Sequence, residues 1–73
     1  MGLRLVARKV HPLSRRQYEV LMLYGDGHTY RQIADKTGVA YKTVCRHFEE
    51  LRLKLGVNSA AEAYLQIKRM TRG

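Results

Sequence analysis

The sequence predicts an all-α domain of four helices, and three observations support this. Ser14, Thr29 and Ser59 are each followed three residues later by Gln or Glu, which is the pattern of a helix capping box. Apolar residues recur at helical spacing after each of these starts and again after residue 41. Glycines follow the first three apolar stretches, where they readily end a helix. With 73 residues, the chain has room for one small domain.

The first helix is predicted over residues 14–24 and begins at the Ser14 cap. It ends at three consecutive helix breakers, which are Gly25, Asp26 and Gly27. Its inward side carries most of its large apolar residues, namely Val20, Leu21, Leu23 and Tyr24.

The second helix is predicted over residues 30–37 and the third over residues 41–55, and together they form a helix-turn-helix. Small Ala34 lets the two helices cross closely, and Gly38 supplies the left-handed residue that the tight turn requires. The third helix ends at Gly56. Its inward stripe has spacings of 4, 3 and 4 residues and consists of Val44, Phe48, Leu51 and Leu55.

The third helix has no hydroxyl at its start, because Ala40 stands where a capping residue is expected. Two interpretations stay open. Either water or a DNA phosphate satisfies the unpaired amides, or the tertiary packing of the helix makes the missing cap tolerable.

The fourth helix is predicted over residues 60–70, and apolar residues surround most of it. Part of this surface must cover the first helix. The remainder is more than one small domain needs, so we expect a two-fold contact between two copies of the chain. The residues predicted for this dimer contact are Ala60, Tyr64 and Ile67.

The chain is strongly basic, with 14 Lys and Arg against 6 Asp and Glu and a net charge of +8. Such an excess attracts polyanions before any specific contact forms. Lys42 and Arg46 are four residues apart, so they share one face of the third helix, opposite its apolar stripe. Both residue types hydrogen-bond the guanine edge in the major groove. The predicted DNA base contacts are Tyr41, Lys42, Cys45 and Arg46.

Alternatives stay open for several residues on this face. Lys42 suits a phosphate as well as a guanine. Cys45 is expected to press against a base edge, although nearby cations would also favour a reactive thiolate. Phosphate would repel Glu49 unless it accepts a hydrogen bond from a cytosine amino group. We expect it instead to be exposed, or paired with Arg46 or Arg52.

Two further motifs are Thr43-Val44 followed by His47, and Lys-Leu-Gly-Val at residues 54–57. With them, residues 13–64 resemble the LuxR/GerE-type helix-turn-helix family. The other matching positions are Leu13, Ser14, Arg16, Glu19, Val20, Leu21, Gly27, Thr29, Ile33, Ala34, Lys42, Glu62 and Ala63. The resemblance implies a four-helix domain that binds DNA with its third helix and often dimerises through its fourth. The chain departs from the family pattern at five positions. Gln17 replaces a usual Glu, Thr37 a Leu, Ala40 a Ser, Cys45 a Lys or similar polar residue, and Ala60 an Arg.

Candidate phosphate contacts surround the third helix. The start of the second helix offers free amides and the positive end of a helix dipole. Thr43 and His47 match the family motif at the boundary of the core, where a purely structural role for His47 is equally open. The resemblance adds Lys54. The predicted phosphate contacts are Thr29, Tyr30, Arg31, Thr43, His47 and Lys54.

These features predict a sequence-specific transcriptional regulator that binds double-stranded DNA as a homodimer, on an inverted repeat with half-sites about 10 bp apart. The third helix would enter the major groove. The alternative is a module like region 4 of sigma factors, which acts by binding RNA polymerase or another regulator. We expect a bacterial or phage protein.

The sequence indicates no catalysis and no metal, cofactor or small-molecule ligand. It has no glycine-rich phosphate loop and no nucleophile with a base, and Cys45 and His47 point in different directions on their helix. Cys45 is the single cysteine, so no intrachain disulfide can form.

Residues 1–12 are expected to form a flexible basic arm, residues 13–70 the domain and residues 71–73 a tail. No signal peptide is visible, and the longest apolar run, residues 20–24, is too short for a bilayer, so we expect a cytoplasmic protein. Met1 favours a complete chain, whose control would then come from its abundance or from a partner.

Overall fold

The computed structural model describes residues 11–71, which contain four α-helices and no strand. The helices are α2 (Arg15–Gly25), α3 (Tyr30–Thr37), α4 (Tyr41–Leu55) and α5 (Ala60–Thr71). The predicted all-α class is confirmed, and each predicted helix end lies within one residue of the observed one. Of the predicted arm only His11 and Pro12 are among the described residues, and of the predicted tail only Thr71, which ends α5.

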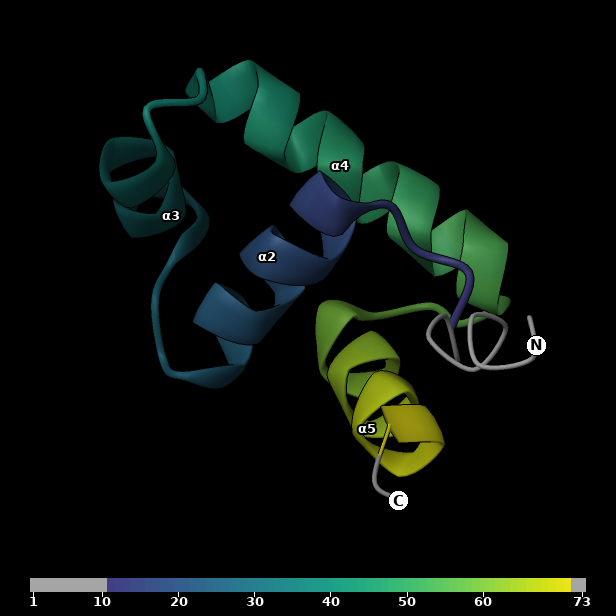
Figure 1. Cartoon of the computed structure of the whole chain (residues 1–73). Helices are drawn as coiled ribbons and strands as arrows, with labels where there is room; N and C mark the ends of the chain where they lie inside the picture. The colour runs from purple at the N-terminus through teal and green to yellow at the C-terminus, as the bar shows by residue number, and fades with distance from the viewer. Residues whose placement is uncertain (1–10, 72–73) are drawn as a thin grey trace, which may run out of the picture.

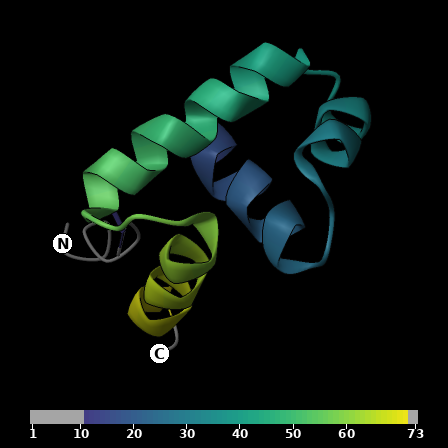
Figure 2. The ribbon, with the colours of Figure 1, turned by 180° about the vertical axis from the view of Figure 1, so that it is seen from behind.

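The long helix α4 runs along one edge of the molecule, and the other helices lie on one side of it (Figure 1). α2 packs against α3, α4 and α5, while α3 and α5 also contact α4. Seen from behind, the same edge of α4 is again free of other helices (Figure 2). One face of α4 is therefore left uncovered by the other described helices.

The opposite face of α4 forms the centre of the hydrophobic core. Val44, Phe48 and Leu51 are fully buried and Leu55 is 9% exposed, so the predicted inward stripe is confirmed. Burial of each such side chain stabilises the fold by roughly 1.5–3 kcal/mol. The rest of the buried core consists of Leu13, Val20, Leu21, Ile33, Ala60, Ala63 and Ile67. Because its apolar side is held in the core, α4 must turn its charged side to solvent.

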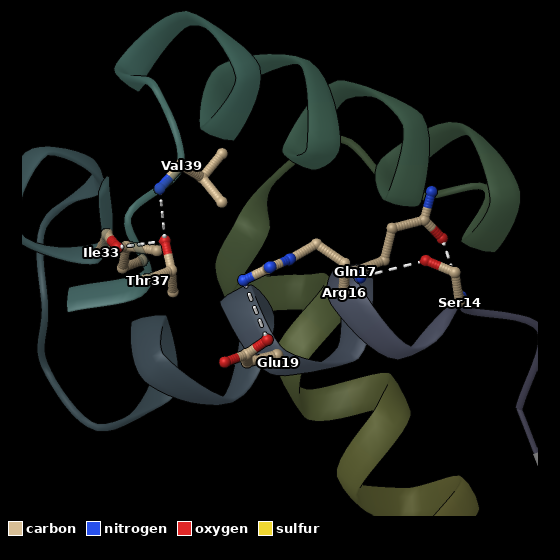
Figure 3. Close-up of polar contacts among 7 residues, drawn as sticks. All are labelled: Ser14, Arg16, Gln17, Glu19, Ile33, Thr37 and Val39. Carbon is tan, nitrogen blue, oxygen red and sulfur yellow. Dashed lines mark hydrogen bonds and ion pairs between the residues drawn. The ribbon is translucent and has the colours of Figure 1, made fainter. Parts of the chain in front are cut away.

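Two of the three predicted capping boxes are complete. At α2, the N–H of Gln17 donates to Ser14 Oγ and the N–H of Ser14 donates to Gln17 Oε1 (Figure 3). Thr29 caps α3 in the same way. At α5, the N–H of Glu62 donates to the Ser59 hydroxyl, but the Glu62 carboxylate accepts from the N–H of the residue before the cap. At α5 the predicted bond to the cap hydroxyl is therefore present, but the predicted return bond from the cap N–H to Glu62 is not.

A buried amide joins the start of α2 to the second half of α4. Gln17 is 6% exposed, and its Oε1 accepts from Lys54 Nζ at 2.9 Å. Its Nε2 donates to Glu50 Oε1 at 3.4 Å, while Lys54 Nζ also lies 3.5 Å from the carbonyl oxygen of Pro12. Leaving a buried amide unpaired costs about 1–3 kcal/mol, so this network fixes how α4 lies on α2.

The dimer contact predicted on the fourth helix is wrong at two of its three residues. Ile67 is fully buried and Ala60 is 7% exposed, because α5 packs this side onto α2 and α4. Tyr64 is half-buried, and its ring lies against Gly25, where any Cβ would overlap it. The solvent side of α5 instead carries Leu65, which is 59% exposed. A contact between copies would have to use that side.

Candidate nucleic-acid interface

The turn between α3 and α4 is fastened by the side chain of Thr37 (Figure 3). Its Oγ1 donates to the carbonyl oxygen of Ile33 at 2.8 Å and accepts from the N–H of Val39 at 3.3 Å. Gly38, between them, has a φ of 76°, a left-handed conformation that glycine adopts without strain. This short turn therefore has a defined geometry, which fixes the angle between α3 and α4.

The start of α4 has no side-chain cap, as Ala40 predicts. The next residue, Tyr41, is 44% exposed, and the guanidinium carbon of Arg31 lies 4.9 Å from the centre of its ring. A cation–π contact at an exposed site is worth roughly 0.5–1 kcal/mol. The interaction therefore places Arg31, which is predicted to contact phosphate, beside Tyr41, which is predicted to contact a base.

The uncovered face of α4 gathers the other predicted base contacts. Lys42 and Arg46 are exposed, and Cys45 between them is half-buried. With Thr43 and Glu49 they line a shallow hollow on the surface of the helix. Within residues 11–71, the side chains of Lys42 and Arg46 form no hydrogen bond or ion pair. Both long cationic side chains are therefore free to reach a ligand.

Tyr30, predicted to contact phosphate, is mainly a packing residue. Its ring stacks on Phe48 at 4.3 Å between centres and meets Tyr24 edge-on at 6.2 Å. Burial raises the pKa of the Tyr30 hydroxyl, an effect that the nearby guanidinium of Arg52 partly offsets. This aromatic cluster anchors the first residue of α3 to the core beside α4.

Of three other residues predicted to contact phosphate, two already form hydrogen bonds within the domain and one has a ring nitrogen without a described partner. Thr29 Oγ1 accepts from the N–H of Gln32 at 3.1 Å and so caps α3. Lys54 is tied to the amide of Gln17. His47 is half-buried, and its Nδ1 is a buried atom with no hydrogen-bond partner in the described part of the chain. Their contacts with phosphate stay predictions.

Sequence reasoning missed two residues that hold this interface in place. Thr37 fastens the turn before α4, and Gln17 fastens the far half of α4 through Lys54. Both positions depart from the usual family residue, and that departure is the signal that could have drawn attention to them.

Comparison with known proteins decides the family. Residues 11–67, more than half of the chain, match the luxR family of bacterial regulatory proteins. The chain belongs to this family. It therefore carries the helix-turn-helix of a family of DNA-binding transcription regulators.

The relatives of this luxR-family chain are much longer proteins. The transcriptional regulatory protein DegU of Brevibacillus brevis is 34% identical over 59 residues, which cover 81% of this chain and 25% of DegU. The HTH-type transcriptional regulator MalT of Yersinia pestis (strain Pestoides F) is 37% identical over 62 residues, which cover 85% of this chain and 7% of MalT. The chain thus spans at most a quarter of either relative. No solved structure matches it.

The described part of this luxR-family domain has neither a metal-binding cluster nor a membrane-spanning helix. Over residues 11–71, no three His, Cys, Asp or Glu side chains gather where they could hold a metal ion. No helix in the same range is long and apolar enough to cross a bilayer.

Proposed function

We propose that this luxR-family domain binds double-stranded DNA sequence-specifically, with α4 in the major groove, as part of a cytoplasmic transcriptional regulator. The observation that carries the proposal is the uncovered face of α4, where Lys42 and Arg46 are exposed and form no hydrogen bond or ion pair with other described residues. An α-helix fits the major groove, where Lys and Arg bind O6 and N7 of guanine. Tyr41 and Cys45 complete the proposed base-contacting set.

The DNA backbone is proposed to be held around this face. Arg31 lies over the ring of Tyr41, so its guanidinium is already beside the start of α4 in the absence of DNA. The net charge of +8 supports the attraction to phosphate, which strengthens as salt is lowered. The other proposed backbone contacts are Thr29, the Tyr30 hydroxyl, Thr43, His47 and Lys54.

A homodimer is proposed to form through the solvent side of α5. Leu65 is 59% exposed there, and with Ala61 and Tyr64 it borders a hollow between α5 and the loop after α2. In a two-fold dimer, the same residues of both copies meet, so one exposed Leu contributes twice. Such a dimer would read an inverted repeat with half-sites about 10 bp apart.

Selection of bound duplexes from a random pool tests the proposal. A specific regulator should enrich one inverted repeat and bind it at least about 10³-fold more tightly than random DNA at the same salt. Equal affinity for every duplex would rule out sequence-specific reading. It would favour a module that acts by binding RNA polymerase or another regulator.

A further inference from the structure

Glu49 is an exposed carboxylate near the cations Lys42 and Arg46, and it has no hydrogen-bond or ion-pair partner among the described residues. It is exposed, and together with Lys42, Cys45 and Arg46 it lines the hollow on the uncovered face of α4. Within residues 11–71, its side chain forms no hydrogen bond or ion pair. The next residue, Glu50, differs, because it accepts from the buried amide of Gln17.

The helical neighbours of Glu49 explain why it stays unpaired. On an α-helix a side chain meets those three and four residues away, here Arg46, Arg52, Cys45 and Leu53. Arg52 lies near the Tyr30 hydroxyl, where its guanidinium partly offsets the rise in pKa that burial causes, and it forms no ion pair with Glu49 among the described residues. Arg46 extends into solvent without closing onto Glu49. The carboxylate therefore faces outward, at a place where DNA phosphates would repel it unless it accepts a hydrogen bond from the DNA.

We propose that Glu49 determines sequence preference by accepting a hydrogen bond from the N4 amino group of a cytosine. This inference rests on the proposed insertion of α4 into the major groove. Cytosine shows only a donor there, whereas guanine shows two acceptors that repel a carboxylate, and adenine shows an acceptor beside its donor. The negative charge of Glu49 therefore disfavours guanine, which is the base that Arg46 is proposed to contact.

The spacing of the two residues specifies where that cytosine lies. Arg46 and Glu49 are three residues apart, which is about 4.5 Å along the helix axis. Successive base pairs are separated by about 3.4 Å. The cytosine is therefore within one or two base pairs of the guanine that Arg46 contacts.

The test compares two variants of the 73-residue chain that each turn one acid into its amide. Glu49→Gln changes the proposed contact. Asp26→Asn makes the same charge change at the C-cap of α2. The loop that follows α2 lies away from the uncovered edge of α4 (Figure 1). Each variant and the original chain is put through random-pool selection and then titrated with the duplex that the original chain selects. Circular dichroism confirms that both variants fold, as their exposed positions predict.

Glu49→Gln should select a different base at a single position, with adenine gaining over cytosine, because Gln binds N6 and N7 of adenine. Its affinity for the original duplex should fall at least about fivefold relative to Asp26→Asn, and the loss should vanish on a duplex in which that pair is A·T. Asp26→Asn should keep the original preference.

If Glu49→Gln selects the same sequence as Asp26→Asn and binds it equally tightly, Glu49 reads no base and the inference is overturned alone. If the original chain enriches no sequence, the proposed function fails, and this inference fails with it.

Discussion

Arg46 lies on the second turn of α4, exposed and without a partner among the described residues. Arg46→Ala should weaken binding to the selected duplex by about 1–3 kcal/mol and relax the preference at one base pair, because a bidentate contact to guanine is lost. Titration of the selected duplex and of its single-base variants, at one fixed salt concentration, measures both effects.

Arg69→Ala is the matched control, since it removes the same charge from an exposed position on α5. It should weaken binding to every duplex slightly and equally. A uniform loss with Arg46→Ala as well would assign Arg46 to the phosphate backbone rather than to a base.

Which side chains of α4 face outward could be predicted from sequence, because the apolar stripe from Val44 to Leu55 determines the inward side. The packing of Tyr30 on Phe48 could not. It depends on how closely α3 approaches α4, and the spacing of residues within each helix does not determine the distance between the two helices. The same holds for Arg31, whose contact with Tyr41 joins two helices.

The crossing of α2 and α5 depends on the absence of a side chain at Gly25, where a Cβ would overlap the ring of Tyr64. Helix propensity alone favours Ala over Gly by about 1 kcal/mol. Overpacking typically costs about 1–3 kcal/mol, so the steric effect should prevail. Gly25→Ala should lower the free energy of unfolding by about 1 kcal/mol, as measured by urea denaturation followed by circular dichroism.

A double-mutant cycle with Tyr64→Ala separates the two effects. Once the ring is absent, Gly25→Ala should become neutral or stabilising, and the difference between the two backgrounds gives the coupling. Stabilisation by Gly25→Ala in the original chain would mean that Tyr64 moves aside at little cost.

Helix boundaries could be predicted closely because their signals are local: Ser14 and Thr29 cap α2 and α3, and Gly56 follows α4 with a φ of 69°. The orientation of α5 could not be predicted, because apolar residues surround it. Only its packing against α2 and α4 shows that Ile67 points inward and Leu65 outward.

Substitution of Leu65 tests whether two copies of the chain assemble through the solvent side of α5. Leu65→Asp would place two like charges near each other across the proposed two-fold contact. It should raise the dimer dissociation constant at least about tenfold, which corresponds to about 1.4 kcal/mol. Sedimentation velocity over a range of protein concentrations measures it, and affinity for a full inverted repeat should fall more than affinity for a half-site.

Leu53→Asp provides the comparison, because Leu53 is an even more exposed leucine, at 79%, but lies on α4. It should leave the sedimentation of the dimer unchanged. If Leu65→Asp also leaves it unchanged, the solvent side of α5 is not the contact between copies.

The neutral amide of Gln17 has a consequence for experiments in salt. Over residues 11–71 the one ion pair joins Arg16 and Glu19, whose side chains are 43% and 49% exposed, and such surface pairs contribute about 0–1 kcal/mol. Lys54 is held by an uncharged oxygen. Screening by added electrolyte therefore has little to weaken inside the folded domain, whereas it displaces a polyanion strongly. An ionic-strength series should consequently report complex formation alone, with the protein remaining folded throughout.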